Sequence, residues 1–331
     1  MSEKVVVTGA TGHIGNVLLR ELQKQDYEVI AFVLKGEDTK CIEDLGCQIV
    51  YGDVQDMSSL KEAFKGAKMV FHLAGIIEIG STNKKKLWQV NVEGTKNVWK
   101  ACKEEKVKRL IYTSSVHAIP EKPKGQEIAE TTTFSKDLVK GSYAKTKAEA
   151  TAFLLSKAKE DVEIVIVHPS GIIGPYEYTI SNLGQLIIDC ANKKIGAYLE
   201  GGYNFVDVRD VAKGTVLAAQ KGEAGECYIL AGHKISVKDL MHQIEEITKV
   251  PAPKFKIARW FAYITGVFSE CYSKIVKEKP LFTSYAVYTL GTNSNFSNKK
   301  AEEKLGYTIR PMEETLKDTI EWFQRQGRIN K

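Results

Sequence analysis

The stretch that decides the fold is "KVVVTGATGHIGNVLLRELQ", residues 4–23. It begins like a strand, breaks into glycines at Gly9, Gly12 and Gly15, and continues with the apolar spacing of a helix. One glycine suffices for a turn, whereas three indicate that a ligand comes close to the backbone. The first permits the tight turn, the second admits a pyrophosphate, and the third lets helix and strand pack closely. The stretch therefore predicts a dinucleotide-binding loop, with phosphates facing the N–H groups of the helix start.

Around this loop, short apolar runs alternate with amphipathic segments. We expect strands at residues 5–7, 29–33, 48–51, 69–73, 109–113 and 163–168. We expect helices at residues 14–25, from the N-cap Asp56 onward, and at 83–105, 142–159 and 313–326. Continuously apolar strands separated by helices are typical of a parallel sheet covered on both faces. The predicted fold is therefore α/β, a doubly wound parallel sheet of the Rossmann type.

The regular alternation weakens after residue 169. Segments such as "GPYEY" (174–178) and "LEGGYNFVDVRDVA" (199–212) are rich in aromatic residues and glycine. We therefore predict a dinucleotide-binding domain at residues 1–168, completed by part of 200–232. Residues 169–331 are expected to form mainly a smaller, partly discontinuous C-terminal substrate lobe.

Composition excludes several classes of protein. The 331 residues carry a net charge of +6 that is spread along the chain, and we interpret the basic run at 84–86 as a solvated helix start rather than a nucleic-acid patch. The six cysteines form no C-x-x-C pair, and no His/Cys cluster has metal-ligand spacing. We therefore expect free thiols, no metal site and a reducing, cytoplasmic location. We also expect no signal peptide and no membrane-spanning segment.

A tyrosine and a lysine in "GSYAKTKAEA" (141–150) suggest proton chemistry. Tyr143 and Lys147 are four residues apart in an expected helix, so their side chains share one face. A phenol is too weak an acid to act as a base at neutral pH, and a neighbouring ammonium lowers its pKa. Tyr143 could then exchange a proton with a hydroxyl or carbonyl oxygen. Alone this spacing is usually a surface pair, but behind a glycine loop and alternating strands and helices it favours catalysis.

Two further segments place polar residues near the expected ligand crevice. The fifth strand ends in "LIYTSSVHA" (110–118), where Ser114 or Ser115 could donate a hydrogen bond to a substrate oxygen. Each serine could equally be a cap or turn residue. Asn91 lies inside an expected helix, where asparagine is a poor former, which indicates a structural hydrogen bond or a proton-relay role.

The end of the second strand bears on the choice of cofactor. Lys35 lies where a cation could meet a 2′-phosphate, whereas Glu37 and Asp38 could turn back toward a ribose. His13, inside the glycine loop, adds a possible donor. This pattern leans toward NADP over NAD, although Lys35 could be an ordinary solvated lysine.

These motifs together resemble the extended short-chain dehydrogenase/reductases of the NAD-dependent epimerase/dehydratase superfamily. Beside the glycine loop and the Tyr–Lys pair, the chain contains in order "GDVQD" (52–56), "HLAG" (72–75), "VNVEGT" (90–95), "YTSS" (112–115), "HPSGIIGP" (168–175) and "FVDVRDVA" (205–212). The resemblance covers nearly the whole chain. It is closest to the dihydroflavonol-4-reductase and 3β-hydroxysteroid dehydrogenase branch, whose closing segment is similar to residues 295–323.

The resemblance implies specific roles. Tyr143 is the catalytic acid/base, Lys147 lowers its pKa and holds the nicotinamide ribose, Ser115 polarises the substrate carbonyl, and Asn91 positions the proton relay. The residues implied to contact the cofactor are Gly9, Thr11, Gly12, His13, Ile14, Gly15, Lys35, Asp53, Val54, Leu73, Ala74, Gly75, Tyr143, Lys147, Pro169, Gly171 and Ile172. One departure is Leu34, where NADP-binding relatives often carry arginine.

The C-terminal half suggests a bulky apolar substrate. Residues 257–278 carry apolar side chains at helical spacing and could form core, a pocket wall or a peripheral membrane contact. Candidate substrate residues are His117, Tyr176, Tyr178 and Phe205.

The sequence predicts an NAD(P)-dependent dehydrogenase/reductase acting on a hydroxyl/ketone pair of a hydrophobic, steroid- or flavonoid-like substrate. The alternatives are a nucleotide-sugar epimerase/dehydratase and, less favoured, a non-catalytic NADP-binding sensor. The resemblance also allows a homodimer.

Overall fold

The computed structural model describes residues 2–77, 83–258, 260–263 and 284–330. Its centre is a seven-stranded sheet in the order β10-β6-β5-β4-β1-β2-β3, and all neighbouring strands are parallel. The strands are β1 (Glu3–Thr8), β2 (Tyr27–Val33), β3 (Gln48–Tyr51), β4 (Met69–His72), β5 (Arg109–Thr113), β6 (Glu163–Pro169) and β10 (Cys227–Leu230). The strand order reverses between β1 and β4, and such a switch point opens a ligand crevice at the carboxyl ends of the strands. The predicted doubly wound sheet is confirmed.

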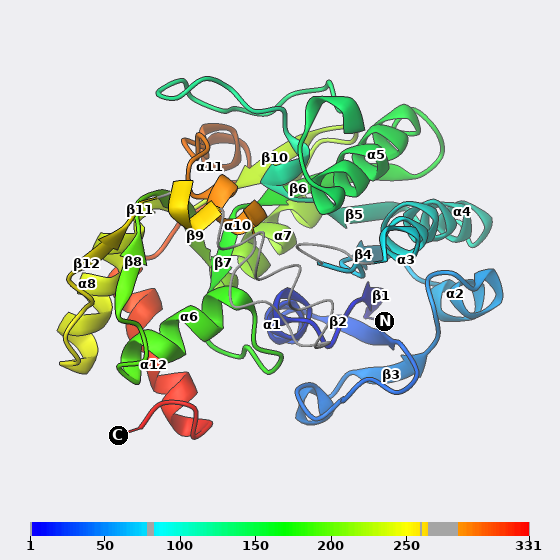
Figure 1. Ribbon diagram of the computed structural model, residues 1–331. Helices are drawn as coiled ribbons and strands as arrows, with labels where there is room; N and C mark the ends of the chain where they lie inside the picture. Colours follow the sequence, from blue (N-terminus) through cyan, green and yellow to red (C-terminus); the bar gives the residue numbers. More distant parts are fainter. Residues whose placement is uncertain (1, 78–82, 259, 264–283, 331) are drawn as a thin grey trace.

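Helices cover both faces of this sheet (Figure 1). One face packs against α2 (Met57–Phe64), α4 (Gly94–Glu104) and α5 (Ser142–Ser156), and the other against α1 (His13–Leu22) and α7 (Val208–Lys221). Side chains alternate along each strand, so that Val6 faces the first layer while Val5 and Val7 face the second. Burial on both faces explains why the strands are continuously apolar.

The prediction of a single α-helix at residues 83–105 is wrong in one respect. The segment consists of α3 (Lys84–Trp88), one π-helical turn (Gln89–Glu93) and α4. The wider turn accommodates Asn91, whose buried side chain bonds to the backbone of Ile76 through both its amide N–H and its carbonyl oxygen. Such π turns are frequent at functional sites. The basic run does open α3, with Asn83 as its N-cap.

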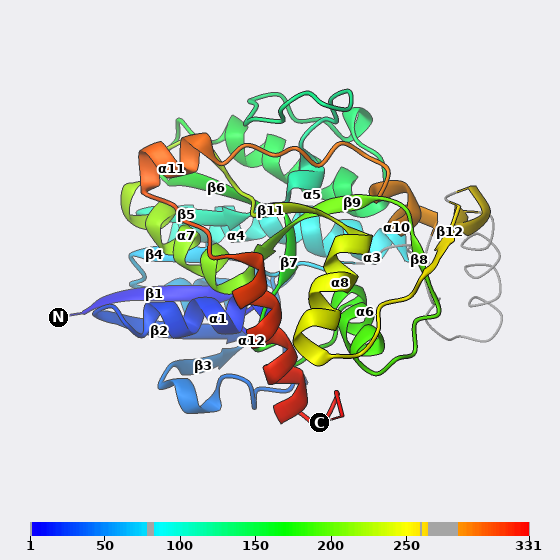
Figure 2. The ribbon, with the colours of Figure 1, turned by 90° about the vertical axis from the view of Figure 1, so that its left-hand side faces the viewer.

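Most of the remaining elements pack beside the carboxyl ends of the strands (Figure 2). They include the helices α6 (Asn182–Ala191), α8 (Val237–Thr248), α10 (Ser284–Thr289) and α12 (Met312–Arg325), whereas α11 (Lys299–Leu305) packs against β10 and α7. Two small sheets contain β7 (Gly171–Ile173), β9 (Gly202–Asp207) and β11 (His233–Ser236), and β8 (Ala197–Leu199) with β12 (Phe255–Ile257). The expected helix at 257–278 lies largely outside the described residues. The helices in the described part of the chain are all too short or too polar to cross a bilayer.

Candidate active site

The glycine loop forms a tight cradle between β1 and α1. Gly9 has a φ of +70°, and a Cβ atom there would lie 2.6 Å from the backbone nitrogen of Ala74. A Cβ atom on Gly15 would lie 2.1 Å from the carbonyl oxygen of Gly9. Neither position therefore accepts a side chain without moving backbone. The first N–H groups of α1 lack partners inside the helix and are free to face an anion.

The segment after β2 folds back onto this loop. The hydroxyl of Thr11 donates a hydrogen bond to Glu37 Oε2 at 2.6 Å. Asp38 instead accepts a hydrogen bond from the backbone N–H of Lys40. Of the acids that follow β2, Glu37 is thus the one whose carboxylate is held at the glycine loop.

Tyr143, Lys147 and Ser115 come together at the carboxyl end of β5. Burial raises the pKa of Tyr143 above its ordinary value, and a side-chain hydrogen bond with Ser115 acts in the opposite direction. Burial lowers the pKa of Lys147 to about 7, and its ammonium donates a hydrogen bond to the Thr113 carbonyl oxygen at 2.8 Å. The hydroxyl of Ser115 also caps the short helix Val116–Ala118 by accepting a hydrogen bond from the N–H of His117. The serine beside it, Ser114, is bonded to Thr151 Oγ1 on α5.

Asn91 lies directly behind this group. Its Nδ2 donates to Thr146 Oγ1, which itself donates to the Tyr143 carbonyl oxygen at 2.8 Å. A Cβ atom on Gly75 would lie 3.2 Å from Asn91 Oδ1 and 3.6 Å from Lys147 Nζ. The backbone after β4 therefore runs close to both side chains.

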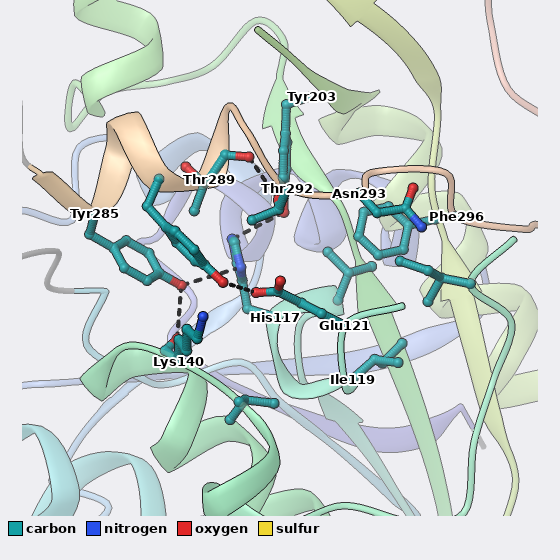
Figure 3. Close-up of a pocket in the computed structure, with 14 residues that line it drawn as sticks. His117, Ile119, Glu121, Lys140, Tyr203, Tyr285, Thr289, Thr292, Asn293 and Phe296 are labelled. Carbon is teal, nitrogen blue, oxygen red and sulfur yellow. Dashed lines mark hydrogen bonds between the residues drawn. The ribbon is translucent and has the colours of Figure 1, made fainter. Parts of the chain in front are cut away.

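A pocket opens beside His117 (Figure 3). His117 stands at its base, 6.3 Å from Tyr143 between ring centroids, and its Nε2 lies 3.1 Å from the Tyr203 hydroxyl. Tyr285, from α10, points toward the same imidazole and also donates to the Lys140 carbonyl oxygen. Burial lowers the pKa of His117 to about 4, so the ring is neutral at physiological pH. The lining residues are Val116, His117, Ile119, Glu121, Ile128, Val139, Lys140, Tyr203, Tyr285, Tyr288, Thr289, Thr292, Asn293 and Phe296.

The structure places the other candidate substrate residues elsewhere. Tyr176 and Tyr178 both pack against Trp322 of α12, with ring centroids 5.0 and 5.1 Å from it. Phe205 lies on β9, where its ring would meet a Cβ atom on Gly171 at 2.9 Å. Phe205 therefore packs against the first residue of β7. Of the four candidates, His117 is the one that lines the described pocket.

The remaining cofactor candidates lie along the crevice at the ends of the strands. Asp53 follows β3 and accepts a hydrogen bond from Gln55, and the neighbouring Val54 is buried against Gly94. The ring of His13 is not free, because its Nε2 lies 2.9 Å from the Pro175 carbonyl oxygen. The other candidates lie at the start of α1, on the loop after β2, after β4, and on β6 and β7: Ile14, Lys35, Leu73, Pro169 and Ile172.

Several pocket residues could not be found from the sequence. Tyr285, Tyr288 and Glu121 carry no motif, and they meet because α10 packs against the loop after β5. Tyr288 donates its hydroxyl to Glu121 across 167 positions of the chain. No local pattern encodes a contact of this kind.

Comparison with known proteins assigns the chain to a family. A family model described as the NAD dependent epimerase/dehydratase family matches residues 5–231. The chain belongs to this family. The predicted resemblance to extended short-chain dehydrogenase/reductases is thereby confirmed.

Relatives of this family member include named reductases and dehydrogenases. It is 30% identical to a putative dihydroflavonol 4-reductase of Synechocystis, covering 99% of this chain and 97% of the relative. It is 28% identical to the mouse sterol-4-alpha-carboxylate 3-dehydrogenase, decarboxylating, covering 97% and 91%. The crystal structure of gox2253 superposes with a TM-score of 0.87 at 33% identity, covering 99% and 100%. These comparisons support the prediction of an oxidoreductase that uses a nicotinamide cofactor.

Proposed function

We propose that this protein interconverts a hydroxyl and a ketone on a hydrophobic, ring-containing substrate, with Tyr143 as the acid/base. The observation that carries the proposal is the meeting of Ser115 and Tyr143 beside an aromatic pocket: the Ser115 hydroxyl acts to lower the pKa of Tyr143, and the tyrosine ring lies 6.3 Å from that of His117, which lines the pocket. A substrate oxygen placed there would meet two hydroxyl groups at once. The glycine cradle lies along the same edge of the sheet.

The residues at this edge fit a dinucleotide. The loop at Gly9 and Gly15 is closed to side chains, and the start of α1 offers N–H groups to phosphates. On the segment between β6 and β7, the buried hydroxyl of Ser170 has no hydrogen-bond partner among the described residues. An unsatisfied buried hydroxyl is costly, which supports a polar ligand group at this position.

The chain's own residues would handle the proton. When bound, the nicotinamide supplies or accepts the hydride. During reduction, Tyr143 would donate its proton to the carbonyl oxygen while Ser115 donates a hydrogen bond to it. The remaining phenolate is best stabilised by a cation, and Lys147 lies one helical turn away on the same face. Asn91 and Thr146 would hold the backbone of Tyr143 in place.

The pocket supports an apolar substrate body. Its inner wall is made of aliphatic and aromatic side chains, among them Val116, Ile128 and Phe296, while Glu121 and Lys140 are exposed at the rim. Binding sites for small molecules are commonly lined by apolar and aromatic side chains with a few polar groups that fix the orientation of the ligand. The sterol- and flavonol-related names of the relatives agree with a ring-containing substrate.

The direct test is turnover with a substrate panel. We expect the purified protein to oxidise reduced nicotinamide cofactor with hydrophobic cyclic ketones, including a steroid ketone, and much more slowly with short hydrophilic ketones. The measurement is the loss of cofactor absorbance together with identification of the alcohol. Conversion of a UDP-sugar without net cofactor consumption would contradict the proposal and favour an epimerase. Cofactor binding without turnover of any ketone would favour a sensor.

We further propose NAD as the preferred cofactor. Although Lys35 leans the sequence toward NADP, the structure adds that Glu37 is held against Thr11 in the phosphate loop. A carboxylate in this region repels a 2′-phosphate and can accept a hydrogen bond from a ribose hydroxyl.

Replacing Glu37 by glutamine should weaken this preference. We expect the ratio of the Kd values for NADPH and NADH to fall about tenfold in Glu37→Gln, because the charge is removed while a polar side chain remains. Asp38→Asn is the matched control, since Asp38 bonds to Lys40 instead. The Kd values are measured by quenching of intrinsic fluorescence. Tighter binding of NADPH than NADH by the unchanged protein would contradict the proposal and restore the role of Lys35.

A further inference from the structure

A buried chain of hydrogen bonds joins the glycine-loop strand to Asn91. Its centre is His72, the last residue of β4, whose side chain is fully buried. Nδ1 of this ring lies 2.8 Å from Thr8 Oγ1, and Nε2 lies 3.0 Å from Thr95 Oγ1. Thr8 and His72 are register partners in neighbouring strands, so their side chains point to the same face of the sheet.

The acceptor at the Asn91 end and a neutral His72 ring together fix the direction of the hydrogen bonds in this chain. The backbone N–H of Ala74 can only donate, so Thr8 Oγ1 accepts from it at 3.3 Å. The carbonyl oxygen of Asn91 can only accept, so Thr95 donates its hydroxyl proton to it at 2.7 Å. Thr95 must then accept from Nε2–H of His72, and because the neutral ring carries one proton, its Nδ1 accepts the proton of Thr8.

The surroundings of His72 favour this neutral tautomer. Burial and the nearby Lys147 ammonium lower the pKa of His72 to about 3. The ring also stacks on Tyr112, with centroids 5.5 Å apart. The imidazole is therefore fixed by its two hydrogen bonds and by this ring.

The chain connects parts of the site that come from different elements. At one end, Ala74 belongs to the backbone that touches Gly9. At the other end, Asn91 lies on the π turn and reaches Thr146, which bonds to the Tyr143 carbonyl oxygen. The cofactor cradle and the helix of the catalytic tyrosine are thus joined through buried side chains.

We infer that His72 and Thr95 are positioning residues that hold Asn91 and the loop after β4 in register with Tyr143. This inference rests on the proposed function, because Asn91 and Tyr143 matter only if proton transfer occurs there. Neither residue touches substrate. They keep the distances between the reacting groups constant. Such constancy matters because small displacements of reacting groups strongly reduce the rate.

The chain offers a matched control for removing one link. Thr95 and Thr215 are both buried helical threonines whose hydroxyls donate to the carbonyl oxygen four residues earlier, at 2.7 and 2.8 Å. Thr215 lies on α7 and donates to Val211, on the other face of the sheet. Of these two threonines, only Thr95 also forms a hydrogen bond with the ring of a histidine, His72.

We expect Thr95→Val to lower kcat at least about tenfold with an unchanged KM for the ketone, because transition-state alignment is lost. Thr215→Val should lose about as much thermal stability as Thr95→Val but keep the kcat of the unchanged protein. Thr95→Ser, which restores the hydroxyl, should recover the rate. Equal kcat in Thr95→Val and Thr215→Val would overturn the inference.

A second measurement does not depend on turnover. In the protein labelled with ¹⁵N-histidine, NMR should show one imidazole as the neutral Nε2–H form from pH 5 to 8. Its signals, identified through His72→Asn, should shift in Thr95→Val and not in Thr215→Val. A protonated ring or the Nδ1–H form would overturn the inference. Failure of the proposed function is distinct, because the unchanged protein would then reduce no ketone while these signals stay as expected.

Discussion

Tyr143→Phe should reduce the rate of ketone reduction by about 10²- to 10⁴-fold, the usual contribution of a positioned general acid. Phenylalanine keeps the ring that lies against His117 and removes only the hydroxyl, whose pKa Ser115 acts to lower. Binding of the cofactor should change little, since the glycine cradle is untouched. The measurement is kcat with a hydrophobic cyclic ketone, beside the Kd of the reduced cofactor.

Tyr228→Phe provides the control for this substitution. Tyr228 is a fully buried tyrosine on β10, and its hydroxyl accepts a hydrogen bond from the Glu223 backbone N–H. Removing this hydroxyl should cost stability on the order of 1 kcal/mol without slowing turnover. If Tyr143→Phe retained full activity, the proton would have to come from another group, and the proposed mechanism would fail.

The second large effect is expected at the glycine loop. Gly9→Ala should destabilise the protein by about 2–5 kcal/mol and weaken cofactor binding more than tenfold. Two causes add: the left-handed φ of +70° is unfavourable for alanine, and the new Cβ atom would lie 2.6 Å from the Ala74 nitrogen. Since that second contact is with backbone, the loop itself has to move.

Gly66→Ala separates these two causes. Gly66 has a φ of +74°, and nothing lies within 4 Å of a Cβ atom placed there. This control should lose only the conformational part, about 1–2 kcal/mol, and bind the cofactor normally. Urea unfolding gives the stabilities, and fluorescence titration gives the affinities. Equal losses of stability and affinity in both variants would show that the close approach to Ala74 has no importance of its own.

Most of the sheet could be predicted because its signals are local. The strands at 29–33 and 109–113 are apolar on both faces, and their burial between two helical layers requires that composition. The glycine loop was predictable for a similar reason. Its spacing reflects contacts made within a few residues of the chain, apart from the approach to Ala74.

The pocket and the π turn depend on contacts between distant parts of the chain. Residues 83–105 contain no proline, and the wide turn carries Asn91, which bonds to Ile76 and Thr146, 15 and 55 positions away in the chain. Tyr176 and Tyr285 are both tyrosines in the less regular half, yet one packs on α12 and the other faces His117. Only the tertiary arrangement decides between them.

The origin of the pocket walls has a consequence for how such a protein can diversify. The groups that we propose to handle the proton lie directly after β5 and on α5: Ser115, Tyr143 and Lys147. The surface that faces them from the other side comes from β9 and α10, which contribute no member of that trio. Under the proposed function, the reacting groups and the residues that would contact the substrate thus lie in separate stretches of the sequence, so substitutions within residues 284–296 should alter the choice of substrate without altering the reaction.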